Sequence, residues 1–255
     1  MREILRQGYI WYKATKFRTT DNMFGSRNYR KFVIISDSRT GSTLLMQLLN
    51  SHPAVIALGE EFKNLHGSSS REVWNRIFRK RPRPICWMGF KLFYFHPSKE
   101  NDREVWDFIE NDKQIVIIHL TRRNILRSYV SKQIGLKTQK WTENINRPHE
   151  ISGEEKKVIL DPGGCQENFE SISGYIEQTE KRFKSHKIIP VVYEDLDKDK
   201  QTTMGRIYKN LDVADFKVNT YMKKQNPEKL KDLITNYSDL KKEFSDTKWE
   251  YLFDE

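Results

Sequence analysis

Short apolar runs alternate along the chain with segments in which apolar residues recur at helical spacing. Mainly apolar runs predict buried strands at residues 31–36, 54–58, 85–95, 114–120 and 188–193. Between these runs, apolar residues recur at three- and four-residue spacing and predict helices around residues 44–49, 105–109, 124–133, 169–183 and 204–211. Strands that alternate with helices predict an α/β fold, in which a central parallel sheet is flanked by helices.

The pattern contains no internal repeat, no low-complexity tract and no linker rich in Pro, Gly or Ser. We therefore expect a single domain over residues 31–255, preceded by an N-terminal extension over residues 1–30. The stretch 141–164 is polar and contains Pro162 and Gly163-Gly164, so a loop is predicted there.

The charge balance favours an anionic partner. The 255 residues include 45 Lys and Arg against 35 Asp and Glu, a formal net charge of +10. A nucleotide, an acidic glycan, a nucleic acid or a membrane surface would each fit this charge. The aromatic content of 12% supplies material for a core and argues against disorder.

Composition also argues against several classes of protein. Two cysteines cannot form a disulfide framework, and the six histidines lack the spacing of zinc ligands, so no metal site is expected. No apolar run approaches the roughly 20 residues of a membrane span. The first residues lack the apolar core of a secretory signal, and a cytoplasmic location is therefore expected.

The turn after the first predicted strand has the composition of a phosphate-binding loop. A helix that starts after a short loop presents free backbone N–H groups and the positive end of its dipole to an anion. Arg39 adds a cation and Gly41 allows close approach of the backbone. The hydroxyl groups that can donate to phosphate here belong to Thr40, Ser42 and Thr43. An ordinary strand-to-helix turn, with Ser42 or Thr43 as the N-cap, is the alternative.

Two better-known nucleotide loops do not match this turn. The pattern Gly-x-x-x-x-Gly-Lys-Ser/Thr is absent, and so is the dinucleotide pattern Gly-x-Gly-x-x-Gly. A kinase-like phosphotransferase that uses Mg-ATP, with a carboxylate from Tyr193-Glu194-Asp195 at its metal, remains as an alternative function. A basic nucleic-acid-binding protein is a second alternative, supported by the charge alone.

Two segments carry a specific resemblance to a known family. Residues 32–53, FVIISDSRTGSTLLMQLLNSHP, resemble the 5′-phosphosulfate loop of sulfotransferases that use 3′-phosphoadenosine-5′-phosphosulfate (PAPS), especially the bacterial carbohydrate-type enzymes. Residues 119–131, HLTRRNILRSYVS, resemble the 3′-phosphate element of that family, with Arg123 and Ser131 at its two marked positions. Residues 192–196 and 236–240 are similar to further family segments. The resemblance implies a sulfotransferase domain with a P-loop-like phosphate site.

The resemblance also implies roles for these residues. Arg39 would stabilise the charge on the oxygen that leaves with the nucleotide, and Arg39 through Thr43 would bind its 5′ end. Arg123 and Ser131 would bind the 3′-phosphate, with Ser128 in place of Ser131 if the helix register differs. Arg122 and Arg127 either assist or are solvated charges. Lys223 and Lys224 are a candidate replacement for the Arg-Lys-Gly loop of the steroid-type enzymes.

The acceptor side of the reaction needs a base. Glu60, in Gly59-Glu60-x-Phe62, matches a family element beyond the second strand, and the neighbouring Glu61 is the alternative because alternate side chains of an extended segment face opposite ways. His96 is a further candidate. Lys91 lies within an apolar strand, where a charge needs a partner or a ligand, and it is a candidate contact for the acceptor or the sulfonate.

The predicted function is therefore metal-independent transfer of a sulfuryl group from PAPS to an acceptor hydroxyl, with 3′-phosphoadenosine-5′-phosphate (PAP) as the product. The resemblance implies a carbohydrate acceptor, with a lipid, a polyketide or a small phenol as the alternative, and a nucleic-acid partner is not expected. Most aromatic residues of such a chain belong to the core, but a few can stack on sugar faces. The candidates for stacking are Trp74, Trp87, Tyr94 and Trp141. The sequence gives no indication of an oligomeric state.

Overall fold

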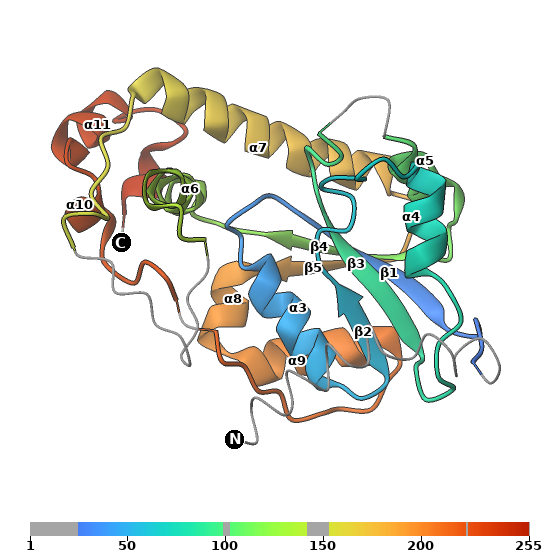
Figure 1. Cartoon of the computed structure of the whole chain (residues 1–255). Coiled ribbons are helices and arrows are strands. Elements are labelled where there is room, and N and C mark those ends of the chain that lie inside the picture. The colour runs from blue at the N-terminus through green and yellow to red at the C-terminus, as the bar shows by residue number, and fades with distance from the viewer. Residues whose placement is uncertain (1–24, 99–102, 142–152, 223, 255) are drawn as a thin grey trace. The chain divides into compact units, whose positions relative to one another are not determined.

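Five strands form one parallel sheet in the computed structural model, which describes residues 25–98, 103–141, 153–222 and 224–254 (Figure 1). The strands are β1 (Arg30–Ser36), β2 (Val55–Leu58), β3 (Trp87–Phe93), β4 (Val116–Thr121) and β5 (Ile188–Val192). Their order is β2-β3-β1-β4-β5, and every neighbouring pair is parallel. The predicted α/β class with a central parallel sheet is confirmed.

The strand order places one loop at a special position. From β1 the chain crosses to β2 at one edge of the sheet, returns to β3 between them, and then passes to the other side of β1 to form β4 and β5. In open parallel sheets, ligands bind beyond the carboxyl ends of the strands, at the point where the order reverses. The turn that follows β1 lies at that point.

The described residues divide into two compact units. The sheet unit comprises the described parts of residues 25–37, 41–121 and 180–219. Its helices are α3 (Ser42–Ser51), α4 (Ser70–Ile77), α5 (Glu104–Asn111), α8 (Tyr193–Lys198) and α9 (Lys200–Leu211). The helical unit comprises the described parts of residues 38–40, 122–179 and 220–254. It contains α6 (Ile125–Thr138), most of α7 (Pro162–Arg182), α10 (Leu230–Leu233), α11 (Tyr237–Glu243) and the 3₁₀ turn η2 (Glu250–Phe253).

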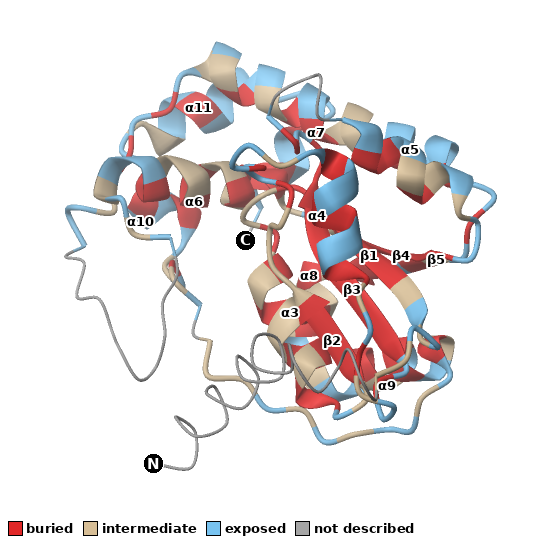
Figure 2. Ribbon diagram, turned by 45° about the vertical axis from the view of Figure 1, so that its right-hand side comes forward, coloured by how far each residue is buried: buried red, intermediate tan, exposed pale blue. Residues whose placement is uncertain are grey.

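The sheet is buried on both faces, because helices of its unit cover both. Trp87 and Phe90 lie three residues apart on β3, so their side chains point to opposite faces. Trp87 donates its indole N–H to the carbonyl of Leu211 at the end of α9, at 2.7 Å. Phe90 packs against Trp74 of α4, with ring centroids 6.1 Å apart. Figure 2 shows the strands as almost wholly buried.

The strands β1 and β3 approach each other closely at Gly89. A Cβ atom added there would lie 2.3 Å from the carbonyl oxygen of Phe32. Any other residue at this position would force the two central strands apart.

The helical unit has an apolar core of its own. Phe169 of α7 lies against Phe244 and Trp249, with ring centroids 5.5 and 5.4 Å away. The fully buried Cys165 belongs to the same core, and burial raises the pKa of its thiol to about 12. This cysteine is therefore a packing residue rather than a nucleophile.

The sequence predicts a loop over residues 141–164, and this prediction is wrong for residues 162–164. Helix α7 already begins at Pro162 and includes both glycines. Asp161 explains the early start, because its carboxylate accepts a hydrogen bond from the backbone N–H of Gly164 at 2.7 Å, and proline is favourable in the first helical turn. Residues 142–152 of that loop lie outside the described part of the chain.

Most of the predicted N-terminal extension, residues 1–24, also lies outside the described residues. In its described end, Ser26 forms an antiparallel bridge with Arg81, with both backbone hydrogen bonds at 2.8 Å. The domain boundary at residue 31 stays a prediction. Among the described helices, none combines the length and the apolar character that a membrane crossing requires.

Candidate active site

The turn between β1 and α3 has a backbone that few residues can adopt. Gly41 is the N-cap of α3 and has φ 85°, and Arg39 has φ 63°. The Tyr193 ring packs directly on Gly41, where an added Cβ would lie 2.3 Å from Cδ2. Glycine is required by the angle and by the space. The N-cap named in the alternative interpretation, Ser42 or Thr43, is therefore wrong, and the start of α3 has no capping side chain from its N-cap residue.

Lys91 joins two predicted site residues in the sheet unit. Its ammonium donates to Thr43 Oγ1 at 3.1 Å and pairs with Glu60 Oε1 at 3.0 Å. The Lys91 side chain is only 6% exposed. We call Thr43, Glu60 and Lys91 the Lys91 cluster. It brings together the start of α3, the segment after β2 and the carboxyl-terminal half of β3, so the partner that a buried lysine needs is present.

The two glutamates of the base prediction differ in their surroundings. Glu60 is 26% exposed, and its Oε2 lies 4.0 Å from His96 Nε2 and 4.0 Å from Lys63 Nζ. Glu61 is also partly buried, but it forms no hydrogen bond or ion pair with the part of the chain that the structure describes. The contacts favour Glu60 as the functional carboxylate.

His96 lies beside Glu60 in a dry environment. Burial lowers the pKa of its imidazole to about 4, although the Glu60 carboxylate acts in the opposite direction. Its Nδ1 is buried and has no hydrogen-bond partner among the described residues. A neutral imidazole with such a pKa is a weak base at pH 7. The surroundings therefore disfavour His96 as the base.

In the helical unit, Arg39 reaches Ser131 of α6. Its Nε and Nη2 donate to Ser131 Oγ at 3.0 and 2.9 Å. The same guanidinium contacts the Trp141 carbonyl and Gln225 Oε1. The backbone carbonyl of Arg39 accepts a hydrogen bond from Arg122 Nη1 at 3.0 Å. The structure thus joins residues from the two segments that resemble nucleotide-binding elements.

Ser131 receives a further donor. It is 9% exposed, and Asn226 Nδ2 donates to its Oγ at 3.2 Å. A hydroxyl that accepts from its neighbours keeps its own hydrogen for another acceptor. We call Arg39, Ser131, Gln225 and Asn226 the Ser131 cluster.

The remaining predicted donors occupy different environments. Arg123 is exposed in the turn before α6, and Thr40 is buried. Ser128 is buried one helical turn before Ser131, and its Oγ has no hydrogen-bond partner among the described residues. Arg127 donates to the carbonyl of Glu228 at 3.0 Å and is therefore not a free helix-face charge.

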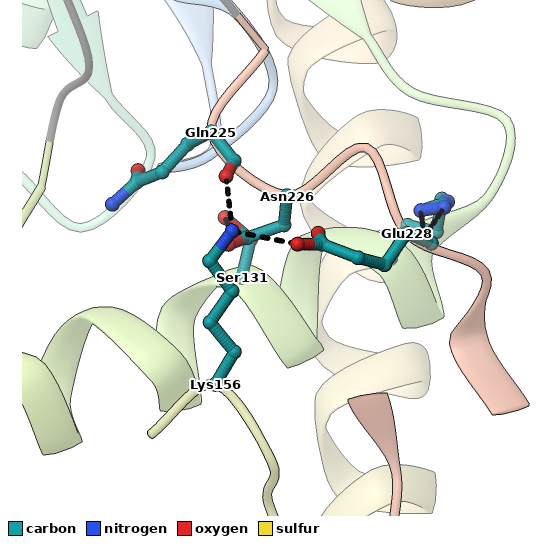
Figure 3. Close-up of polar contacts among 6 residues, drawn as sticks. Ser131, Lys156, Gln225, Asn226 and Glu228 are labelled. Carbon is teal, nitrogen blue, oxygen red and sulfur yellow. Dashed lines mark hydrogen bonds and ion pairs between the residues drawn. The ribbon is translucent and has the colours of Figure 1, made fainter. Parts of the chain in front are cut away.

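The sequence does not predict that segment 224–228 places Gln225 and Asn226 against Arg39 and Ser131. Figure 3 shows how it is fixed: Lys156 donates to Glu228 Oε1 at 2.7 Å and to the Gln225 carbonyl at 3.3 Å. Gln225 Nε2 donates to the Lys140 carbonyl at 2.6 Å. Of the proposed lysine pair, Lys224 is exposed and Lys223 lies outside the described residues. The only signal in the sequence is the proximity of this segment to that pair.

The fold that carries this site is that of a sulfotransferase. The structure superimposes on the crystal structure of a sulfotransferase from Alicyclobacillus acidocaldarius with a TM-score of 0.50 and 13% sequence identity. The match covers 84% of this chain and 88% of that chain.

In sequence, the chain is similar to Nodulation protein H from two species. It is 22% identical to the protein from Rhizobium meliloti (strain 1021) over 242 residues, which are 88% of this chain and 94% of the relative. It is 24% identical to the protein from Rhizobium tropici over 183 residues, 65% of this chain and 68% of the relative. No protein-family model matches the chain. The similarity in fold agrees with the resemblance of residues 32–53 and 119–131 to sulfotransferase segments.

Proposed function

We propose that this chain is a sulfotransferase that moves a sulfuryl group from PAPS to a hydroxyl of a carbohydrate acceptor. The observation that carries the proposal is the pair of hydrogen bonds from Arg39 to Ser131. Each residue belongs to one of the two segments that resemble PAPS-binding elements, and 92 residues separate them in the sequence. Residues that bind the two ends of one nucleotide must lie near each other, and the contact between Arg39 and Ser131 supports this arrangement.

The donor would be held by cations and uncapped N–H groups. Residues 39–43 would bind the 5′-phosphosulfate, because the start of α3 directs backbone N–H groups at an anion. Ser131 would donate its hydroxyl to the 3′-phosphate, and the exposed Arg123 would provide a second, charged donor.

The Lys91 cluster suits the transfer step. The acceptor oxygen forms a bond to sulfur while the bond from sulfur to the bridging oxygen breaks, and PAP departs with that electron pair. Glu60 would take the proton of the acceptor hydroxyl. Lys91, held by Thr43 and Glu60, would stabilise charge on the sulfuryl oxygens, and Arg39 would stabilise the oxygen that leaves.

Calorimetric titration in EDTA tests the donor site. We expect wild type to bind PAP and to bind adenosine 5′-phosphate, which lacks the 3′-phosphate, at least about tenfold more weakly, a difference of about 1.4 kcal/mol. Arg123→Ala should remove most of that preference. Arg76→Ala, which removes an exposed arginine of α4, is the control and should leave it intact.

Other results would favour the alternatives. Equal binding of the two nucleotides by wild type would refute a PAPS site. Binding of ATP that requires Mg²⁺ would favour the kinase-like phosphotransferase. Binding to nucleic acid that weakens steeply with salt, together with no preference for a mononucleotide that has a 3′-phosphate, would favour a nucleic-acid-binding protein. The cytoplasmic location stays a prediction.

A further inference from the structure

Trp141 is the exposed member of the four aromatic residues considered for sugar stacking. Trp74, Trp87 and Tyr94 are 8%, 2% and 6% exposed and belong to the core of the sheet unit. Trp141 is 40% exposed. The other tryptophans in the described part of the chain, Trp106 and Trp249, are buried as well. An indole left in water at this level has surface available for a ligand.

The position of this ring is fixed from two sides. A Cβ atom added at Gly135 of α6 would lie 2.8 Å from both Cε3 and Cζ3, so the indole packs on the bare backbone of the helix. The Trp141 carbonyl accepts a hydrogen bond from the Arg39 guanidinium. That guanidinium also lies over the indole, 6.0 Å from the ring centroid. The ring is therefore held before any ligand arrives, which lowers the entropy cost of binding.

We propose that the indole of Trp141 is the surface on which a sugar ring of the acceptor lies, beside Arg39. The inference rests on the proposed function and specifies its acceptor. A pyranose ring has an apolar face of C–H groups, which packs on an aromatic face, and a rim of hydroxyls, which need polar neighbours.

The surroundings of Trp141 match a sugar better than a phenol or a steroid. Apolar acceptors are bound in cavities lined mainly by hydrophobic side chains. The Arg39 guanidinium donates to the Trp141 carbonyl, and the Gln225 amide donates to the neighbouring Lys140 carbonyl. One flat apolar surface beside hydrogen-bonding groups is complementary to a molecule with one apolar face and a polar rim.

Titration of the full-length protein saturated with PAP tests the proposal. The probes are cellotetraose, whose rings have flat apolar faces, sorbitol, which has hydroxyls and no ring, and p-nitrophenol, an apolar aromatic acceptor. Wild type should bind cellotetraose and not sorbitol or p-nitrophenol. Trp141→Ala should weaken cellotetraose binding at least about tenfold and leave PAP affinity within about twofold. Trp141→Phe should retain part of the affinity for cellotetraose.

The control removes another exposed aromatic ring of the same unit. Tyr251, on η2, is 53% exposed, and Tyr251→Ala should change neither affinity. Equal binding of cellotetraose by Trp141→Ala and wild type would overturn the inference. So would a loss of PAP affinity in Trp141→Ala, because the ring would then belong to the adenine site. Absence of cellotetraose binding, or preference for p-nitrophenol, would overturn it too, whereas absence of PAP binding in wild type would refute the proposed function itself.

Discussion

The Lys91 cluster and the Ser131 cluster handle charge in different ways. Lys91 is paired with the carboxylate of Glu60 at 3.0 Å, so the cluster has its own counter-charge. In the Ser131 cluster, Arg39 donates hydrogen bonds to a hydroxyl, an amide oxygen and a backbone carbonyl. These hydrogen bonds hold the guanidinium beside the Ser131 hydroxyl. Under the proposed function, the Lys91 cluster would take the acceptor proton and the Ser131 cluster would bind the nucleotide.

Replacement of the carboxylate should have the largest effect. Glu60→Gln keeps the shape of the side chain and removes its basicity, so the single-turnover rate should fall about 10²–10⁴-fold. PAP affinity should be unchanged, because the Ser131 cluster is intact. Glu61→Gln is the matched control and should retain most of the rate. A Glu60→Gln protein with the wild-type rate would remove the distinction between the clusters.

A second change tests whether the loop beside the Lys91 cluster depends on glycine. Gly41→Ala should lower the free energy of unfolding by about 2–4 kcal/mol, because alanine is strained at φ 85° and its Cβ would collide with Tyr193. Gly174→Ala, in α7, places its Cβ in open space and should stabilise the protein by up to about 1 kcal/mol. Urea denaturation measures both. A Gly41→Ala protein as stable as wild type would contradict the packing of Tyr193.

Acid should weaken the sheet unit through its buried histidines. His119 of β4 is bonded to the Tyr94 hydroxyl at 2.8 Å, and burial lowers its pKa to about 4, as for His96. The unfolded chain, with an ordinary histidine pKa near 6.5, binds more protons between about pH 6.5 and pH 4. The free energy of unfolding should therefore fall as the pH drops through that range.

His119→Gln separates this contribution from the rest. The amide does not titrate and still offers an acceptor to Tyr94. The loss of stability between pH 7 and pH 4.5 should be smaller than in wild type by about 1–3 kcal/mol, measured by urea denaturation at the two pH values. Identical losses of stability in the two proteins would show that His119 does not contribute to the acid sensitivity.

The smallest expected effect sharpens the role of the Ser131 cluster. Ser131→Ala removes one donor to the 3′-phosphate, so PAP affinity should fall about tenfold while the affinity for adenosine 5′-phosphate changes little. Ser128→Ala removes a buried hydroxyl one helical turn away and is the control. A larger loss in Ser128→Ala would mean that Ser128 faces the nucleotide.

Strong local signals made most of the sheet predictable. The apolar runs that predict β1 and β4 differ from the observed strands by only a few residues, because strands buried on both faces read as continuous apolar stretches. Helix α4 was missed although its start has a capping box between Ser69 and Glu72, a signal that a search for Ser-x-x-Glu would have found. The sequence does not predict the start of α7, because Pro162 and Gly163-Gly164 are typical of a loop, whereas here Pro162 opens the helix and Asp161 accepts from the Gly164 N–H.

The site was predictable where it depends on short motifs. Arg39 and Ser131 lie in segments that can be recognised locally. Asn226 and Lys156 could not be placed, since their contacts with Ser131 and Gln225 span 95 and 69 residues and depend on how α6, α10 and the segment between α9 and α10 fold together. Local composition carries no information about such distant pairs.

The packing of Trp141 on Gly135 has an evolutionary consequence. A side chain at position 135 and an indole at position 141 exclude each other, since a Cβ would lie 2.8 Å from the ring. Descendants of a common ancestor should therefore change the two positions together, with glycine at 135 wherever tryptophan is kept at 141. Such paired changes among related genes would show which lineages have kept the same ring surface.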